Sequence, residues 1–147
     1  MVSRLRSWLR LPRAERRHTL EAALLLMVAC VAVRLLPFRW YVRAMGRPGG
    51  APVGVPGSAT GVDQIARDVS RALRRASRHL PWHSTCLMRA LAGRAMLRRR
   101  NCPGTVYVGV ERREGTDHAF HAWLVAGAVP VSGVREASRF TAIATFH

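Results

Sequence analysis

The sequence predicts an α+β fold, in which a group of helices is followed by an antiparallel sheet. Apolar residues recur at helical spacing up to about residue 100, and short runs that alternate apolar and polar residues come after it. A segment with six glycines and three prolines, residues 46–61, interrupts the helical part. We therefore expect an N-terminal helical region over residues 1–45, a linker over 46–61 and the main domain over 62–147.

The N-terminal region is predicted to be helical over residues 3–45. Pro12 suits a helix start and places Glu15 in the first turn, where a carboxylate complements the helix dipole. Pro37 should break this helix because it has no backbone N–H to donate. Gly46 is expected to end the second piece as a C-cap.

Residues 22–33 form an unbroken run of 12 apolar residues. The run is shorter than the ~20 residues that cross a bilayer, and runs of about 10–14 residues are typical of buried helices. We expect this helix to pack on the rest of the protein or on a partner. Reversible, peripheral attachment to an anionic membrane is the alternative.

Two more helices are predicted in the main domain. The first has Asp63 in its opening turn and presents one apolar side, made of Ile65, Val69, Leu73, Ala76 and Leu80. Leu80-Pro81-Trp82 interrupts it. The second begins after Ser84 or Thr85, both good N-caps, and stops at Asn101-Cys-Pro-Gly104.

The sheet is predicted from strands at residues 105–111, 118–125 and 129–131, with a fourth at 140–146 and a turn at 113–116. Side chains alternate between the two faces of a strand. In the second strand, this alternation places the two histidines on opposite faces. One face carries His121, Trp123 and Val125, and the other carries His118, Phe120, Ala122 and Leu124.

The charge is strongly positive, because 24 basic residues, all of them arginine, oppose 8 acidic ones, which gives a net charge of +16. Such a chain attracts anionic partners: nucleic acid, acidic peptide or lipid headgroups. No helix-turn-helix, zinc or RNA-recognition signature accompanies the charge, which argues against nucleic acid. The three scattered cysteines make no Cys-x-x-Cys pair and fit a reducing cytoplasm.

Cys86 lies in the first turn of the second helix predicted for the main domain, which is an unusual setting for a cysteine. The N–H groups and the positive dipole end of a helix start favour thiolate over thiol. The alternative is a small buried side chain, the commonest state of free cysteine; Cys30 and Cys102 are expected to be of that kind. Close ligand spacing is lacking among Cys86, Cys102, His118 and His121, so no metal site is predicted.

A nucleophilic cysteine needs a base, and a histidine on the sheet could supply it. Four stretches carry this combination: Thr85-Cys-Leu-Met-Arg-Ala-Leu91, Leu97-Arg-Arg-Arg100, Val108-Gly-Val110 and His121-Ala-Trp123. Through them the domain resembles the transglutaminase-like, papain-type domain of lasso-peptide maturation proteins, and specifically their stand-alone leader peptidase. Glu21-Ala-Ala-Leu-Leu-Leu26, Leu36-Pro-Phe38 and Ser138-Arg-Phe-Thr141 extend the resemblance over nearly the whole chain.

The resemblance implies that Cys86 is the nucleophile and His121 the base, whereas His118 matches nothing in the motif. It also implies an aspartate on the strand after the histidine, where residues 126–133 contain no carboxylate. Asp117 precedes His121 by four residues, about 13 Å along a strand, which is too far for contact. Glu136, Ser132 or a backbone carbonyl could orient the imidazole instead, since this third role fixes the tautomer.

The function implied by the resemblance is a cysteine protease that removes the leader from a ribosomally made lasso-precursor peptide before ring closure, without a cofactor. The implied partners are the precursor peptide, a separate leader-binding protein and an asparagine-synthetase-like cyclase. The expected location is the cytoplasm. The alternatives are a transglutaminase-like acyl-transfer enzyme, an inactive scaffold of the same fold that presents a peptide, and, with least support, a nucleic-acid-binding module.

Overall fold

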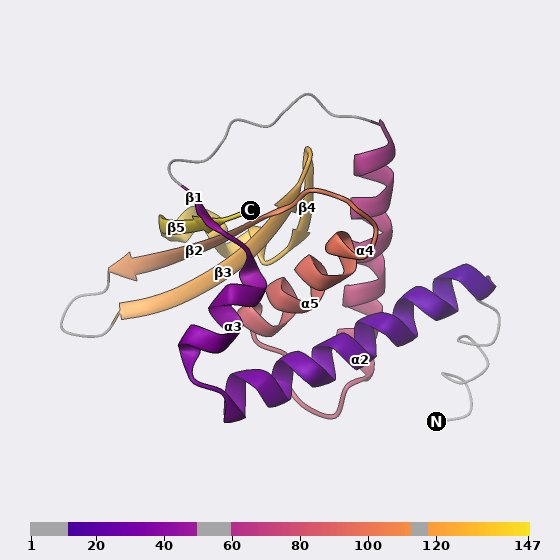
Figure 1. Ribbon diagram of the computed structural model, residues 1–147, viewed down its shortest axis with the longest axis horizontal. Helices are drawn as coiled ribbons and strands as arrows, with labels where there is room; N and C mark the ends of the chain where they lie inside the picture. The colour runs from indigo at the N-terminus through magenta and orange to yellow at the C-terminus, as the bar shows by residue number, and fades with distance from the viewer. Residues whose placement is uncertain (1–11, 50–59, 113–117) are drawn as a thin grey trace.

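The computed structural model describes residues 12–49, 60–112 and 118–147 of the chain (Figure 1). In chain order the elements are α2 (Arg13–Leu35), α3 (Phe38–Met45), β1 (Pro48–Gly49), α4 (Thr60–His79), α5 (Cys86–Arg98), β2 (Thr105–Arg112), β3 (His118–Ala126), β4 (Val129–Ser132), the 3-10 helix η1 (Val134–Arg139) and β5 (Thr141–Phe146). The five strands form one antiparallel sheet in the order β1-β5-β2-β3-β4. Helices and sheet together confirm the α+β class.

The helix boundaries follow the local signals in the sequence. α2 ends at Leu35 and α3 begins at Phe38, so Pro37 breaks the helix as expected. Gly46, with φ 126°, ends α3. The hydroxyl of Thr85 caps α5 by accepting the N–H of Met88 at 3.3 Å. The predicted helix over residues 3–11 and the turn at 113–116 lie outside the described residues.

One strand was not predicted. Pro48–Gly49, at the start of the expected linker, pairs with Phe146 and Thr145 of β5 and forms the edge strand β1. Backbone hydrogen bonds between Arg47 and His147, at 3.0 and 3.1 Å, extend this pairing. Two residues in a Gly/Pro-rich stretch carry no local strand signal. Their partner strand is almost 100 residues away in the sequence, so this pairing could not be predicted. Residues 50–59 of the expected linker lie outside the described residues, and Thr60 and Gly61, its last two residues, begin α4.

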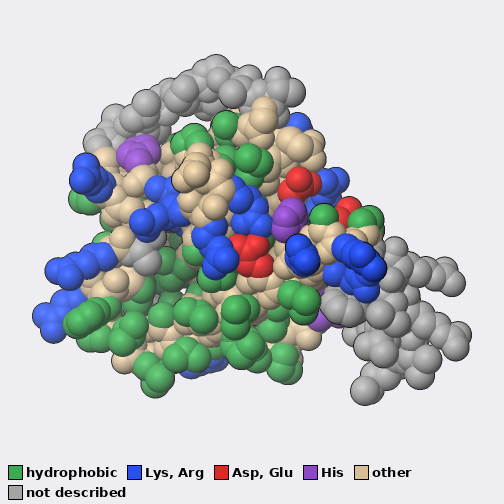
Figure 2. Space-filling view, turned by 45° about the vertical axis from the view of Figure 1, so that its right-hand side comes forward, with side chains coloured by type: hydrophobic (Ala, Val, Ile, Leu, Met, Phe, Trp, Pro, Cys, Tyr) green, Lys and Arg blue, Asp and Glu red, His purple; other side chains and the backbone are tan. Residues whose placement is uncertain are grey.

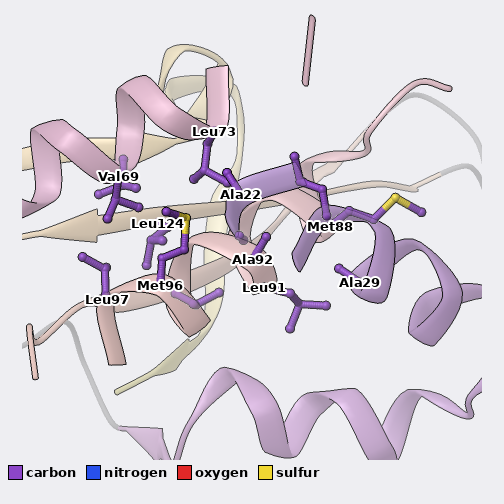
Figure 3. Close-up of a cluster of buried hydrophobic side chains, with 14 of the residues drawn as sticks. Ala22, Ala29, Val69, Leu73, Met88, Leu91, Ala92, Met96, Leu97 and Leu124 are labelled. Carbon is purple, nitrogen blue, oxygen red and sulfur yellow. The ribbon is translucent and has the colours of Figure 1, made fainter. Parts of the chain in front are cut away.

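The hydrophobic core lies between the helices and one face of the sheet (Figure 3). α2 contributes Ala22, Leu26 and Ala29, and β3 contributes Leu124. α4 and α5 contribute the larger set: Val69, Leu73, Met88, Leu91, Ala92, Met96 and Leu97. Gly93 of α5 faces Leu124 and Leu73 so closely that a Cβ there would lie 2.7 and 2.9 Å from their methyl groups. The N-terminal region and the main domain therefore share one core.

Ion pairs also hold α2 to the other helices. Glu15 accepts a hydrogen bond from Arg75 of α4 at 2.5 Å. Glu21 lies 2.6 Å from Arg100 and 3.1 Å from Arg99, both just after α5. The hydrogen bond from Arg100 holds the pKa of Glu21 below its ordinary value of 4.5, although burial opposes the shift. These contacts fix the N-terminal half of α2 to α4 and to the end of α5.

Candidate active site

Cys86 is the first residue of α5 and is half-buried, with its side chain packed against the main core. The first backbone hydrogen bond of the helix runs from Arg89 N–H to Thr85 O at 3.1 Å, and the Thr85 hydroxyl takes the N–H of Met88. The N–H groups of Cys86 and Leu87 have no partner among the described residues. The thiol thus lies beside two unpaired donors at the positive end of a helix dipole.

His121 lies in the middle of β3, and its side chain is only 10% exposed. Its Nε2 is 2.6 Å from the carbonyl oxygen of Gly133. A carbonyl can only accept, so Nε2 carries the proton in the neutral ring and Nδ1 is left with the lone pair. The backbone of Gly133 therefore fills the orienting role for which the sequence offered no aspartate.

Gly133 can take this position because it has no side chain. Its φ is 71°, in the left-handed region, and a Cβ would lie 2.6 Å from the carbonyl oxygen of Ala122 and 3.2 Å from Trp123 Cα. The turn between β4 and η1 can therefore cross directly over β3. This close crossing brings the Gly133 carbonyl to the imidazole.

The two side chains proposed for the third role differ in position. Glu136, in η1, places Oε2 4.0 Å from His121 Nε2, but its side chain is 58% exposed. Ser132 ends β4 with a buried hydroxyl that has no partner among the described residues. Glu136 is thus near enough to interact with a protonated His121, whereas Ser132 makes no hydrogen bond to the ring.

The strand alternation predicted for β3 is present. Ala122 belongs to the main core with the helices, and so does Leu124. Trp123 is buried without belonging to that cluster, and it stacks on Tyr107 of β2 with ring centroids 5.4 Å apart. His121, which shares the face of Trp123, stacks 4.8 Å from Phe140. The imidazole therefore lies on the face of the sheet away from α4 and α5.

The structure brings His121 together with Gly133, Glu136 and Phe140, but it does not join His121 to Cys86. Among the described residues no hydrogen bond or ion pair links the thiol to the imidazole. Cys86 packs on the helix side of the sheet, and the His121 ring is enclosed on the other side. Each group is well placed locally, but no hydrogen bond joins the two.

A cleft of about 990 Å³ connects their surroundings. One wall is formed by α4 and residues 81–84, the loop that leads into Cys86. The other is formed by β4 and the start of η1, including Gly133 and Glu136. Neither Cys86 nor His121 lines the cleft, but the backbone that carries each of them borders it.

The cleft is strongly basic. Six arginines line it: Arg71, Arg74, Arg75, Arg78, Arg89 and Arg135. Glu136 is the acidic residue among its described lining. Trp82 Nε1 and Arg89 Nε, both donors only, are buried at its wall without a hydrogen-bond partner among the described residues. A ligand that brings acceptor oxygens would suit this lining.

The remaining cysteines and the second histidine lie elsewhere. Cys102 is buried, and burial raises the pKa of its thiol. Cys30 is buried in the core on α2. His118 is exposed at the start of β3, on the other face from His121. Within the described parts of the chain, no group of three or more His, Cys, Asp and Glu side chains could hold a metal ion.

Sequence reasoning missed Phe140 and did not choose Gly133 among the orienting candidates. Phe140 ends η1, and its ring covers the imidazole from a position that no motif marks. The Ser-Gly pair at 132–133 is a turn signal. It predicts a change of direction after β4, but not the strand that the turn crosses.

These features define a class of protein: a helix that opens with cysteine, packed on an antiparallel sheet that carries histidine, as in thiol-dependent peptidases and acyl-transfer enzymes. The model of one family, described as the transglutaminase-like superfamily, matches residues 27–145, and the chain belongs to that superfamily. The matched residues include Cys86 and His121. Activity in this superfamily is generally of the cysteine-peptidase or acyltransferase type. No curated protein and no solved structure matches the chain.

Proposed function

We propose that the protein is a cytoplasmic cysteine protease that removes the leader from a ribosomally made lasso-precursor peptide before the ring is closed. The superfamily match supports the chemistry, and the combined Cys86 and His121-Ala-Trp123 motifs support the subfamily. The observation that carries the proposal is a half-buried cysteine at a capped helix start, with a histidine whose tautomer is fixed by Gly133.

In the proposed reaction the sulfur of Cys86 attacks the carbonyl carbon of the scissile bond, and a C–S bond forms. The unpaired N–H groups of Cys86 and Leu87 can donate to the oxyanion that develops. Nδ1 of His121 takes the thiol proton and returns it to the leaving amine as the C–N bond breaks. Water then hydrolyses the thioester and frees Cys86.

This reaction requires the thiol and the imidazole to meet when substrate binds. Catalytic hydrogen bonds are often long or unformed in free enzymes and tighten in the substrate complex. Because the two groups lie on opposite sides of the sheet, closing the cleft between the 81–84 loop and the Gly133 turn is not sufficient, and the imidazole must also move to the side that α5 covers.

The basic cleft suggests which part of the substrate it would hold. Arg74, Arg78 and Arg135, together with the unpaired donors, suit the carboxylates of an acidic leader segment, since guanidinium binds carboxylate through two parallel hydrogen bonds. Arg71 and Arg75 are already paired with Asp68 and Glu15. We further propose that a separate leader-binding protein delivers the precursor and that an asparagine-synthetase-like cyclase receives the product. Both partners come from the subfamily resemblance.

The test is leader removal from a precursor peptide, followed by mass spectrometry. Cys86→Ala and His121→Ala should each abolish cleavage while circular dichroism remains unchanged. His118→Ala, a matched histidine on the same strand, should keep full activity, and so should Cys102→Ala once its folding is verified. Full-rate cleavage by the Cys86 variant would end the protease proposal.

Acyl transfer is the second candidate, because the superfamily includes that chemistry. Both reactions pass through the same thioester on Cys86 and differ in the group that resolves it. A competing primary amine separates them: a protease gives the free acid, and an acyl-transfer enzyme gives the amide. A wild-type chain that forms no thioester would instead be a peptide-presenting scaffold.

A further inference from the structure

An apolar stripe runs along the outer side of α2 and α3. It consists of Leu20, Leu24, Met27, Val28, Val31, Leu35, Leu36 and Trp40, which are 46–76% exposed. The two other large hydrophobic side chains exposed among the described residues are Phe120 and Ile143. Positions 20, 24, 27, 28, 31 and 35 repeat at helical spacing, so they lie on one face of α2. Figure 2 shows apolar side chains gathered along the lower part of the molecule.

The stripe is not the face by which α2 joins the fold. Ala22, Leu26, Ala29 and Cys30 face α4 and α5 and are buried. Between Thr19 and Val33 the helix contains one charged residue, Glu21, and that carboxylate is bound by Arg99 and Arg100. α2 is therefore apolar on its inner and on its outer side.

Exposed arginines flank both ends of the stripe. Arg13 and Arg17 lie before it, and Arg34, Arg39 and Arg43 lie at the other end. Trp40 is exposed among the latter group. Apolar side chains framed by cations, with a tryptophan at the boundary, are typical of segments that lie in the headgroup region of an anionic bilayer.

We propose that the apolar stripe of α2 and α3 docks in the plane of an anionic membrane, with its side chains in the headgroup–acyl boundary and the flanking arginines on lipid phosphates. The sheet and the candidate active site then face the aqueous side. This proposal does not depend on the protease function.

The contacts of α2 with α4 and α5 indicate that the helix lies on the membrane and does not cross it. α2 has 23 residues and is long and apolar enough to span, although the 12-residue run alone is not. Within its most apolar window, 28% of the residues are buried in the fold. Crossing would remove Leu26 and Ala29 from the core and take the Glu15 and Glu21 carboxylates away from their arginines.

The experiment is flotation of the full chain with vesicles. With phosphatidylglycerol–phosphatidylcholine vesicles we expect binding, and with phosphatidylcholine alone much weaker binding. The double variant Leu24→Ser/Val31→Ser should bind anionic vesicles at least about tenfold more weakly. The matched control Phe120→Ser/Ile143→Ser, which removes the exposed apolar side chains elsewhere, should bind like the wild type.

Arginine variants and salt test the contribution of charge to vesicle binding. Arg39→Gln/Arg43→Gln should lose about fivefold per arginine on anionic vesicles, because each basic residue near such a surface contributes about 1 kcal/mol. High salt should release the wild type. Circular dichroism and thermal unfolding establish that each variant is folded.

Three results would overturn the proposal. Equal loss of binding in the stripe and control variants would show that the stripe has no special role. Retention on vesicles through an alkaline carbonate wash would show a spanning helix. A dimer in lipid-free solution that Leu24→Ser/Val31→Ser dissociates, with no vesicle binding by the wild type, would make the stripe an interface between two copies.

Discussion

The contact between Gly133 and His121 shows how a backbone group can replace a side chain. The imidazole needs one fixed acceptor to set its tautomer, and a carbonyl serves as well as a carboxylate for this purpose. A carbonyl carries no charge, however, so it would stabilise an imidazolium less than an aspartate does. Glu136, 4.0 Å away, supplies the nearest negative charge among the described contacts of the ring.

Gly133→Ala is predicted to disturb this contact. The left-handed φ costs a non-glycine residue about 1–2 kcal/mol, and the new Cβ would meet Ala122 O at 2.6 Å. We expect urea denaturation to show a loss of at least that size, and leader cleavage to fall further than stability explains.

Gly61→Ala is the matched control for that substitution. Gly61 lies in α4, and a Cβ there would meet nothing within 4 Å. The same chemical change should leave stability equal or raise it by about 0.5–1 kcal/mol. If both alanine variants behave alike, the Gly133 turn is not a constrained position.

At the scale of elements, the attachment of α2 depends on the ionisation of Glu21. Its pKa is lower in the folded protein than in the unfolded chain, because Arg100 donates to the carboxylate. The contact therefore stabilises the fold above the unfolded pKa and is lost as pH falls through the folded pKa. The contribution should be present near neutral pH and absent in strong acid.

Glu21→Gln is predicted to cost about 1.5–3 kcal/mol near neutral pH, the range for hydrogen bonds to charged groups. The difference from wild type should shrink in acid, as pH falls from the ordinary glutamate pKa of 4.5 through the lower pKa of the folded protein. Urea denaturation at a series of pH values measures it. Glu136→Gln, an exposed glutamate, should show little difference at any of them. A Glu21→Gln penalty that is constant with pH would mean that the charge is not what holds α2.

Elements with local signals could be predicted, and elements that depend on distant partners could not. The Thr85 cap, the break at Pro37 and the strand alternation of β3 are encoded within a few residues. The alternation places His121 and Leu124 on opposite faces of the sheet, but it does not predict which face the helices cover. Which face the helices cover depends on how the core residues of α4 and α5 pack. The separation of His121 from Cys86 could therefore not be predicted from the sequence.

The same limit applies to the apolar run at residues 22–33. Its composition predicts a helix that must hide apolar surface. It does not show that small residues such as Ala22 and Ala29 would take the inner side, whereas Leu24 and Val31 would remain outside. Small residues make up most of the inner side, where helices pack closely, and Leu26 is the one large side chain among them.

At the scale of the whole molecule, the helices and the sheet of the described residues share one core. We predict that the chain alone cleaves a precursor peptide slowly and that a leader-binding protein raises the rate. Time courses with and without that partner measure the effect. A precursor lacking its leader is the control and should gain nothing from the partner. Equal rates with and without the partner on the full precursor would contradict the prediction.

The placement of α2 has a consequence for the synthesis of the protein on the ribosome. α2 is made before its packing partners, and Glu21 meets Arg100 only after 79 more residues have been joined. At about 5–20 residues per second this takes roughly 4–16 seconds. During that interval both apolar sides of the helix are uncovered. We therefore expect chaperones that bind hydrophobic segments to recognise α2 in the nascent chain before the core exists.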